Sequence, residues 1–475
     1  MRIVVVGAGP GGIGAAAPLA AAGHQVIVLD RDPAPPDDDE VAWETWQRRS
    51  VPQTRQPHFF LARLWKEMAE SAPELKAELE ACAPAVLHFA DRIAPFAVDR
   101  DPQPGDAELT AMGYRRPTFE RALRRWLTTK PNIELRCGVE VAGLMAPPNG
   151  AIPHVRGVVL SDGSTIEADL VVAATGRHGA AARWVEEIGG GPVEEAVADA
   201  GLAYFSRYYR MAPGAEFPKQ FGPIAMDYGT MILFTFPADH DTFTLGCVTL
   251  SDDAEMRHVN KNDAFDRLMR NMDRTRPWLE DTGATPIGDV RPMARIEDRR
   301  RRLVVEGRPA ALGFLLTADA AMCTNPVMGR GTSLGWIAGR RLADAVEEHG
   351  ADLEKLALAL DEVTERELRP FFEDSLATDK VRFAGMRAVV DGLPRPEPDP
   401  SDVAATMSAA VQFAMAYDGV CFRAGARRFM LLDPLDAIQS NTDVITRAID
   451  IWGRRAELPQ PALPSRADVL AAIAG

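Results

Sequence analysis

Short runs of apolar residues alternate with helix-compatible stretches at the start of the chain. Residues 2–6 form a β-branched run that ends at Gly7, which predicts a buried parallel strand. The alanine-rich stretch 12–22 predicts a packed helix that ends at Gly23, and residues 24–29 predict a second strand. This order of elements is that of a βαβ unit of about 30 residues.

Helices and short strands follow in the next part of the chain. Residues 61–82 and 117–128 predict helices because their apolar positions recur with a helical period. Residues 133–144 and 155–166 predict the strand pairs of a small β-meander, which leads into a buried strand at 168–173.

The pattern changes in the second half of the chain. Aromatic and β-branched residues dominate 202–250 and predict an antiparallel sheet. Residues 308–316 predict a buried strand, followed by a glycine-rich loop and a helix at 332–348. The remainder, 351–475, is predicted to be mostly helical, with a proline-rich linker at 393–399.

Two charged segments predict solvated loops. Residues 32–40 are rich in Pro and Asp, and residues 298–302 read Asp-Arg-Arg-Arg-Arg. Runs of this kind are usually exposed faces or loops, so neither segment is expected to carry chemistry.

Composition narrows the class of protein. The 475 residues include 53 Lys+Arg and 68 Asp+Glu, and the net charge of −15 argues against a nucleic-acid binder. The five cysteines form no C-x-x-C pair, so neither a disulfide scaffold nor a metal site is expected. We see no export sequence and no run of 18 apolar residues, and therefore expect a soluble cytoplasmic enzyme without an integral membrane segment.

The first candidate site is a glycine-rich loop between the first strand and the first helix. Gly7, Gly9 and Gly12 form a G-x-G-x-x-G motif, which permits a tight turn and brings backbone N–H groups close to a pyrophosphate. Asp30, which follows the second strand, is placed to accept a hydrogen bond from an adenosine ribose. The motif predicts a bound dinucleotide but does not separate FAD from NAD.

Further motifs resemble those of FAD-dependent monooxygenases of the aromatic-hydroxylase and squalene-epoxidase type, and most closely a bacterial subgroup that contains polyether epoxidases. The resemblance covers most of the chain. The segments that carry it are Arg48–Gln53 with His58, Arg116–Leu123, Ala168–Arg177, Thr317–Ala321 and Asn325–Gly331. Ser50 and Ala318 stand where the family has glycine, and Phe119 stands where it has leucine.

The resemblance implies a role for individual residues. Arg48 and Arg116 would contact phosphate or ribityl oxygens of FAD, although isolated arginines more often form surface ion pairs. Asp319 would bind the ribityl chain. The loop that contains Pro326, Gly329 and Gly331 would present N–H groups to the flavin ring.

The resemblance also implies a division of the chain into four parts and an α/β fold. We expect a Rossmann-like FAD-binding domain in two pieces, an inserted antiparallel β-sheet substrate domain, and a helical C-terminal region. The predicted boundaries are 1–195 and 291–348 for the FAD-binding domain, 196–290 for the substrate domain and 349–475 for the C-terminal region.

The implied activity is monooxygenation. One oxygen atom of O₂ would pass, through a flavin C4a-hydroperoxide, to an apolar small molecule between residues 202–250 and the flavin, by epoxidation or hydroxylation. The cofactor carries this chemistry, so no catalytic side chain is named. Electrons come from NAD(P)H. Thr175-Gly176 replaces the family's Asp-Gly pair and no second G-x-G-x-x-G is present, which favours a separate flavin reductase, while direct use of NAD(P)H stays open.

Two alternatives belong to other classes. One is an FAD-dependent reductase or dehydrogenase that acts on a prenyl-type or polyketide substrate, and the other is a flavin-binding protein without enzymatic activity.

Three further candidates have simpler interpretations. Cys323 is expected as a buried apolar filler and His58 as part of a structural turn. Four methionines are expected more as core than as substrate contacts: Met226, Met231, Met322 and Met328.

Overall fold

A five-stranded parallel sheet forms the centre of the first half of the chain. The computed structural model describes residues 1–147, 151–460 and 462–475. The strand order is β21–β10–β1–β2–β6, and every pair is parallel. The strands are β1 (Arg2–Val6), β2 (Gln25–Asp30), β6 (Ile133–Cys137), β10 (Leu170–Ala173) and β21 (Phe314–Leu316). The chain thus returns to its first sheet, with β21, after it has built the antiparallel sheet.

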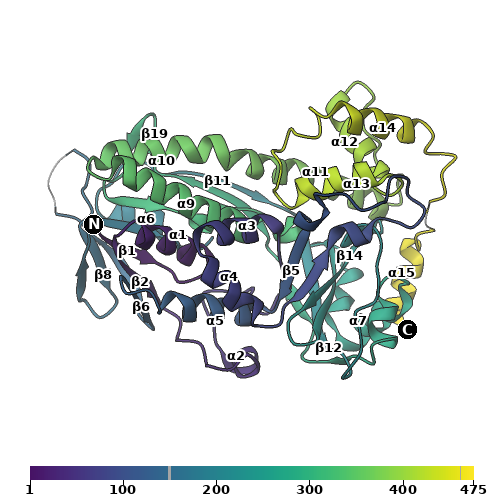
Figure 1. Cartoon of the computed structure of the whole chain (residues 1–475), viewed down its shortest axis with the longest axis horizontal. Coiled ribbons are helices and arrows are strands. Elements are labelled where there is room, and N and C mark those ends of the chain that lie inside the picture. Colours follow the sequence, from purple (N-terminus) through teal and green to yellow (C-terminus); the bar gives the residue numbers. More distant parts are fainter. Residues whose placement is uncertain (148–150, 461) are drawn as a thin grey trace.

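Both faces of this sheet are covered, as the uninterrupted apolar runs predict. Ile3 and Val5 pack under α1 and α9, whereas Val4 and Val171 pack on the opposite side. One side carries α1 (Pro10–Ala21), α3 (Ala62–Ser71), α4 (Pro73–Glu80), α5 (Arg116–Leu127), α9 (Gly331–His349) and α10 (Leu353–Glu367) (Figure 1). The other side carries α6 (Ala181–Glu187) and the small sheet β7 (Val141–Met145), β8 (Gly157–Leu160) and β9 (Thr165–Glu167).

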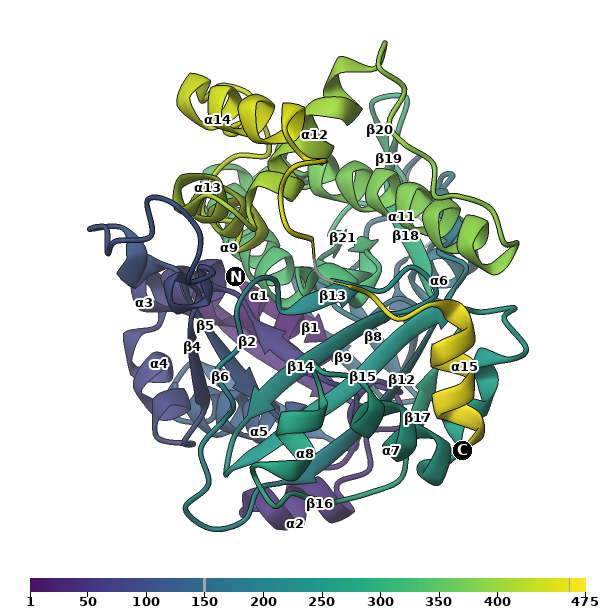
Figure 2. The same cartoon turned by 90° about the vertical axis from the view of Figure 1, so that its right-hand side faces the viewer.

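The second large sheet is antiparallel, as predicted for residues 202–250. Its order is β13–β14–β15–β12–β16, with β17 also paired to β12. Figure 2 shows α7, α8 and α15 in front of this sheet and α11 above it. The strands are β12 (Leu202–Arg210), β13 (Ala225–Asp227), β14 (Ile232–Ala238), β15 (Thr242–Leu250), β16 (Thr285–Pro286) and β17 (Arg291–Met293). The helices are α7 (Asn262–Asn271), α8 (Arg276–Glu280), α11 (Arg369–Val390) and α15 (Arg466–Ala474).

Smaller elements connect the two sheets. One three-stranded sheet contains β3 (His58–Phe60), β4 (Ala85–His88) and β5 (Thr110–Tyr114). Another contains β11 (Glu194–Asp199), β18 (Glu297–Arg302) and β22 (Met322–Cys323), and a two-stranded one contains β19 (Val304–Val305) and β20 (Arg308–Pro309). Short helices are α2 (Asp39–Thr45) and five 3₁₀ turns: Phe89–Arg92, Asp106–Glu108, Met256–Asn260, Ala318–Ala320 (η4) and Pro326–Met328 (η5).

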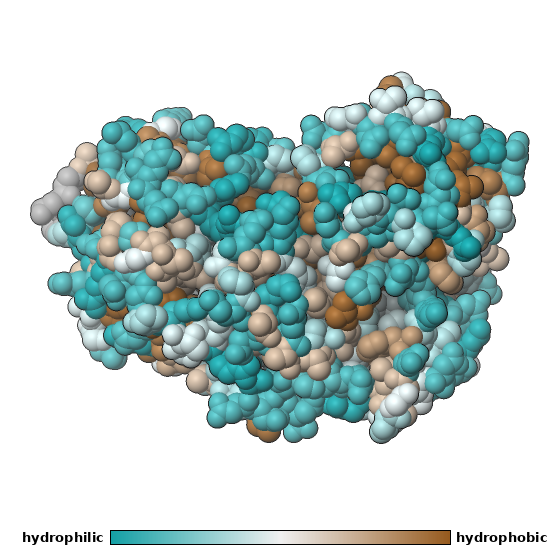
Figure 3. All heavy atoms as spheres, in the orientation of Figure 1, coloured by the Kyte–Doolittle hydropathy of each residue, from teal (hydrophilic) through white to brown (hydrophobic). Residues whose placement is uncertain are grey.

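The C-terminal region is helical, as predicted. After α10 and α11 it contains α12 (Val403–Ala414), α13 (Gly419–Phe429) and α14 (Thr442–Gly453) before α15. In the space-filling view, brown apolar residues gather at the upper right, where Figure 1 shows α12, α13 and α14 (Figure 3). No helix in the described ranges is both long and apolar enough to span a bilayer.

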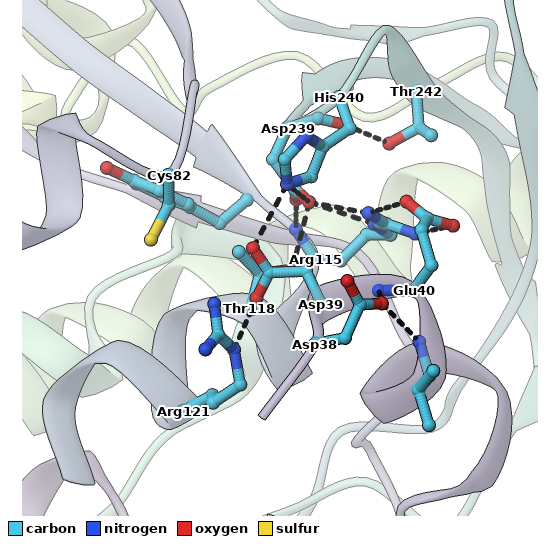
Figure 4. A network of polar contacts seen from close by, with 12 residues as sticks. Asp38, Asp39, Glu40, Cys82, Arg115, Thr118, Arg121, Asp239, His240 and Thr242 are labelled. Atoms are coloured by element: carbon cyan, nitrogen blue, oxygen red, sulfur yellow. Dashed lines mark hydrogen bonds and ion pairs between the residues drawn. The ribbon is translucent and has the colours of Figure 1, made fainter. Parts of the chain in front are cut away.

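A network of charged side chains ties the antiparallel sheet to the first half of the chain (Figure 4). Arg115, directly before α5, is fully buried and donates through Nε to Asp239 Oδ2 at 3.0 Å, at the end of β14. The same guanidinium donates to Glu40 Oε1 of α2 at 2.6 Å. His240 contacts Asp39 Oδ2 at 3.1 Å. We call Asp39, Glu40, Arg115, Asp239 and His240 the interdomain clasp.

Several predictions about single elements are wrong. Residues 133–137 do not belong to a β-meander, because β6 pairs with β2 and extends the parallel sheet. The predicted helix 61–82 is two helices, since Pro73 cannot continue α3 and instead starts α4. The predicted loop 32–40 ends in α2, which Asp38 caps. The predicted strand 308–316 is two short strands, β20 and β21.

The charge run 298–302 is also not a loop. It is strand β18, and its arginines are neutralised from both sides. Arg299 pairs with Glu195 of β11, and Arg302 donates to Asp361 of α10 at 2.7 Å. Asp298 is only 1% exposed. The four-part division of the chain into domains stays a prediction.

Candidate functional site

The carboxyl ends of four parallel strands meet at one edge of the sheet and bring the predicted residues together. The glycine loop follows β1, Asp30 ends β2, Thr175-Gly176 follows β10, and Asp319 follows β21. In open α/β sheets this is the edge at which ligands bind. The topology therefore assembles a candidate site from segments that lie more than 300 residues apart in the sequence, at Gly7 and Asp319.

The glycine loop leaves room on one side only. A Cβ atom at Gly12 would lie 1.8 Å from Gly7 O, and one at Gly7, whose φ is +112°, would lie 2.4 Å from Ala174 O. A Cβ at Gly9 would have no neighbour within 4 Å among the described residues. No side chain in the described ranges caps α1, so its first-turn N–H groups face this open side. An uncapped helix start beside open space suits a diphosphate.

The start of a second helix, α9, lies close to the same glycine loop. Ala318 has a φ of +50°. A Cβ atom added at Gly11 would lie 2.3 Å from the Cβ of Ala318. A Cβ at Gly335 of α9 would lie 3.1 Å from the Ala318 Cβ. Ala318 thus takes the left-handed conformation that the family's glycine adopts freely, so the replacement of glycine leaves this turn in place. It packs between the first turns of α1 and α9.

The loop before α9 has the geometry of an anion site. Pro326 starts η5, and Gly329, with a φ of +64°, ends it. Helix α9 begins at Gly331, and no side chain among the described residues caps it. Its first N–H groups and positive dipole end can therefore stabilise negative charge on a ligand.

Asp319 lies under this helix start. A Cβ at Gly331 would lie 3.9 Å from Asp319 Oδ1. The Asp319 side chain is half-buried, and burial raises the pKa of its carboxyl, while Arg116 and Arg177 act against this rise. The Cys323 thiol also favours the charged form of this carboxyl, but no backbone or side-chain N–H in the described ranges donates to it, so acceptor positions are left for hydroxyl groups of a ligand.

Asp30 is more heavily engaged than the sequence predicts. Its Oδ2 accepts from Ala8 N at 3.0 Å, and its Oδ1 accepts from Asp32 N at 2.9 Å. Arg124 also donates to Oδ2, and Arg48 approaches it at 3.4 Å. A carboxylate offers about four acceptor positions, so little capacity beyond one on Oδ1 is left for a ribose hydroxyl.

Arg48 is likewise committed to protein partners. Its Nε donates to Asp32 Oδ2 at 3.0 Å, and its Nη1 donates to Glu120. Burial alone would raise the pKa of the Glu120 carboxyl, but Arg48, Arg116 and Arg124 lower it to about 2. The guanidinium and carboxyl groups here form a closed buried network, which we call the Asp30 network: Asp30, Asp32, Arg48, Glu120 and Arg124.

Arg116 is the predicted arginine that faces the ligand side. Its Nε donates to Glu120 Oε1 at 2.5 Å, and its Nη1 donates to His58 Nε2 at 2.9 Å. Burial, followed by the charge of Arg116, lowers the pKa of His58 to about 3. His58 is therefore neutral, donates from Nδ1 to Gln56 O at 2.8 Å, and accepts from Arg116 through Nε2.

Sequence reasoning missed three members of the Asp30 network. Asp32 falls in a segment predicted to be a solvated loop, yet it is 3% exposed. Glu120 and Arg124 follow Arg116 at intervals of four residues, which places all three on one face of α5. That spacing is the feature of the sequence from which Glu120 and Arg124 could have been predicted as partners of Arg116.

A polar pocket of about 400 Å³ adjoins Arg48. It is lined by residues from 47–56 and 289–292, which include Arg49, Arg55 and Arg291. Arg55 donates through Nε to Trp43 O at 2.8 Å. The lining also includes Asp289, but the arginines outnumber it and these three have no carboxylate partner in the described part of the chain, so the pocket is cationic overall.

Aromatic side chains form a continuous apolar contact beside the candidate site. Phe236 of β14 stacks on Phe234 and on Phe59 of β3, with ring centroids 4.9 Å and 5.5 Å apart. Phe59 contacts Phe89 at 5.9 Å, and Phe89 contacts Phe429 of α13 at 6.0 Å. A Cβ at Gly329 would lie 3.6 Å from the backbone O of Phe59, so the strand that carries Phe59 passes beside the loop before α9.

The described residues fit FAD on two further counts. Thr175 Oγ1 and Thr317 Oγ1, at the ends of β10 and β21, are buried without a hydrogen-bond partner in the described part of the chain. Two uncapped helix starts also face a carboxylate that has free acceptor positions. Buried orphan hydroxyls and helix N-termini are suited to a ligand with phosphates and a polyol.

Comparisons with known proteins find one matching family and several similar proteins. Residues 2–209 match the family described as glucose inhibited division protein A. Protein Rv3254 of Mycobacterium tuberculosis is 26% identical over 472 residues, which cover 94% of this chain and 92% of that protein. The 6-hydroxy-3-succinoylpyridine 3-monooxygenase HspB of Pseudomonas putida is 26% identical over 347 residues, which cover 70% of this chain and 76% of that enzyme.

Solved structures share the fold. PqsL from Pseudomonas aeruginosa, described as a probable FAD-dependent monooxygenase, superposes with a TM-score of 0.57 at 16% identity and covers 82% of this chain and 96% of its own. The anhydrotetracycline hydroxylase OxyS from Streptomyces rimosus gives a TM-score of 0.57 at 17% identity, over 91% of this chain and 77% of its own.

The chain therefore shares the α/β fold of PqsL and OxyS, as predicted, and one of the relatives named here, HspB, is a monooxygenase. The narrower resemblance to polyether epoxidases stays a prediction. So do the roles of the individual site residues.

Proposed function

We propose that this protein is an FAD-dependent monooxygenase that inserts one oxygen atom of O₂ into an apolar, ring-containing small molecule. The observation that carries the proposal is the convergence of the Gly7–Gly12 loop, the start of α9 and Asp319 beside a chain of stacked phenylalanines. Bound FAD would supply the oxygen-transfer chemistry. The comparisons do not favour the alternative of a reductase or dehydrogenase.

Each residue group then has a task. N–H groups of the first turn of α1 would hold the diphosphate, with Gly9 leaving the space for it. Asp319 would accept from ribityl hydroxyls, and Arg116, fixed by His58 and Glu120, would lie beside it. Gly329, Gly331 and the first N–H groups of α9 would face the flavin ring. Asp30 would accept one ribose hydroxyl, whereas Arg48 would act through the Asp30 network rather than on phosphate.

The aromatic chain supports an apolar substrate. Phe59, Phe89 and Phe236 offer ring faces and edges, which favour aromatic or polycyclic partners. Packed aromatic residues also exclude water, and this matters because water competes with the oxygen-transfer step.

The cationic pocket supports direct reduction by NAD(P)H. Arg49, Arg55 and Arg291 have no carboxylate partner among the described residues, and guanidinium groups of this kind bind phosphates. A separate flavin reductase stays the alternative source of electrons. The five cysteines are all free, which supports a reducing cytoplasmic location.

The test begins with the purified holoprotein. We expect a flavin absorption spectrum with one FAD per chain, and incorporation of one ¹⁸O atom from ¹⁸O₂ into an apolar aromatic substrate. Substrate turnover without O₂ would instead identify a reductase. A colourless protein that takes up no FAD on titration would overturn the proposal.

The electron route is tested in the same preparation. We expect the protein to oxidise NAD(P)H without an added reductase. A raised KM for NAD(P)H in Arg291→Ala would support binding of NAD(P)H in this pocket. The exposed Arg308→Ala is the matched control, because it lies outside the pocket. If the flavin is reduced only when a reductase is added, the pocket is not a binding site for NAD(P)H.

A further inference from the structure

A pair of buried carboxyl groups lies behind the loop that precedes α9. Asp298 of β18 is 1% exposed, and its Oδ1 accepts from Asn325 N at 2.8 Å. Its Oδ2 is buried and receives no hydrogen bond from any N–H or hydroxyl in the described residues. A buried carboxylate oxygen without a donor is costly when charged, so this oxygen is the natural place for a proton.

Asp379 of α11 is the second member of the pair. Its Oδ1 accepts from Arg382 Nη1 at 3.0 Å, and its Oδ2 accepts from Asn325 Nδ2 at 2.9 Å. Asn325 therefore holds both carboxyl groups, because its backbone N–H donates to Asp298 and its side-chain amide donates to Asp379. Two buried carboxyl groups held by one residue repel each other when both are charged, and one proton between them removes this repulsion.

The surroundings favour one proton between the two groups. Burial raises the pKa of Asp298 to about 6, and the neighbouring charge of Asp379 acts in the same direction. Burial also raises the pKa of Asp379, against the influence of Asn325 and Arg382. The charged or titratable groups that face the pair are Arg177 after β10, Tyr204 on β12, Cys323 on β22 and Arg382 on α11.

Asn325 connects this pair to the candidate site. Its side chain is 1% exposed, and its Oδ1 accepts from the hydroxyl of Tyr204 and from Val327 N at 3.2 Å. Together with the bonds to Asp298 and Asp379, one asparagine joins β18, β12, α11 and the loop that begins with it. The next six residues, 326–331, include Pro326, Gly329 and Gly331.

We propose that Asp298 and Asp379 share one proton and, through Asn325, hold the loop 325–331 in position. The role of this loop toward the flavin rests on the proposed function, whereas the shared proton does not. Loss of the proton to solvent leaves two adjacent negative charges, which repel each other and weaken the hold on Asn325. Asp298 and Asp379 are thus positioning residues, and the position of the loop depends on pH.

The shared proton is tested first in the protein without cofactor. Infrared spectra are recorded from pH 4 to pH 8 with and without ¹³C-labelled aspartate. We expect the C=O band of a buried carboxylic acid, which shifts on labelling and disappears as pH rises through the titration of the pair. Asp298→Asn removes the band and keeps an acceptor for Asn325 N–H, so this variant should fold.

Glu297→Gln is the matched control, because Glu297 is the neighbouring residue of the same strand and pairs with Arg299. This variant should keep the band. Absence of the band in the wild-type protein, or its persistence in both Asp298→Asn and Asp379→Asn, would overturn the shared proton.

The effect on the loop is tested by titration with FAD at the same pH values. For the wild-type protein we expect the affinity to fall by up to about tenfold for each pH unit above the titration of the pair. In Asp298→Asn the affinity should not change with pH, and in Glu297→Gln it should follow the wild type. Equal pH dependence in the wild type and Asp298→Asn would overturn the positioning role.

The two proposals can fail separately. A protein that shows the infrared band but binds no FAD would refute the proposed function and the positioning role, and leave the shared proton supported. A protein that binds FAD and turns over substrate without the band would refute the shared proton alone.

Discussion

Buried carboxyl groups occur in two regions of this molecule, and the two regions neutralise them differently. In the Asp30 network the three carboxylates pair with Arg48 and Arg124 and, through Glu120, with Arg116, so charge is balanced by charge. At the end of β18, Asp298 has no cation in contact among the described residues, and the balance comes from a proton. Guanidinium groups stay charged at any ordinary pH, whereas a shared proton can leave in mild acid or at neutrality. The comparison therefore predicts that the region around Asp30, at the end of β2, keeps its structure as pH changes. The region around Asp298, on β18, should depend on pH. We call these two regions the rigid edge and the pH-sensitive edge.

The largest expected effect comes from removing a cation of the rigid edge. Arg48→Ala leaves buried carboxylates without a partner, and we expect it to lower the free energy of unfolding by about 3–5 kcal/mol. Denaturant unfolding measures this. Arg136→Ala is the control, because its pair with Glu134 on the neighbouring strand β6 is exposed and is worth about 0–1 kcal/mol. Equal losses in the two variants would show that the network contributes nothing beyond surface charge.

The pH-sensitive edge predicts a smaller, conditional effect. The pKa of Asp298 in the folded protein, about 6, lies above its ordinary value of 3.8, so its contribution to stability is complete below about pH 4 and is lost as pH rises through 6. The wild type should therefore lose up to about 3 kcal/mol relative to Asp298→Asn over this interval. Parallel stability curves for the two proteins from pH 4 to pH 7 would contradict a titrating Asp298.

Asp319 differs from both regions, because it has free acceptor positions. Asp319→Asn should weaken FAD binding by roughly 10- to 150-fold, as expected for loss of a hydrogen bond worth about 1.5–3 kcal/mol. The stability of the cofactor-free protein should stay within about 0.5 kcal/mol of wild type. Cofactor titration and denaturant unfolding measure the two quantities. The exposed Asp162→Asn serves as the control, and a fully loaded Asp319→Asn with a normal spectrum would remove Asp319 from the cofactor site.

The smallest effect is expected at His58. Its pKa of about 3 means that the ring stays neutral from pH 5 to pH 8, so its side-chain nitrogen resonances should not shift over this range. Exposed histidines in the same NMR spectra should titrate near pH 6.5. A titrating His58 would show that burial and the charge of Arg116 do not hold it in the neutral form.

The sequence predicts the first βαβ unit and its glycine loop well, because local patterns determine both. Residues 2–6, 12–22 and 24–29 carry the period and the boundary residues of their elements, and they form β1, α1 and β2. Asp319 and Gly331 could be predicted as a pair only through the resemblance, since β21 places them at the sheet edge through long-range pairing.

The missed features all depend on partners that are distant in the sequence. Residues 298–302 have the composition of an exposed loop, and they become a strand because carboxylates of β11 and α10 neutralise their arginines. Asp298 is then buried by α11, about 80 residues later in the chain. Residues 133–137 are likewise ambiguous in isolation, and join the parallel sheet because β2 offers a free edge.

The interdomain clasp has one consequence for how the two halves of the molecule communicate. Arg115 is fixed to Asp239 of the antiparallel sheet, and the next residue, Arg116, is fixed to Glu120 and His58. Consecutive Cα atoms are about 3.8 Å apart across a rigid peptide bond, so a displacement of the β14–β15 turn is passed through one residue to these contacts. A shift of the antiparallel sheet therefore reaches Glu120, and with it the Asp30 network, without any movement of the parallel strands.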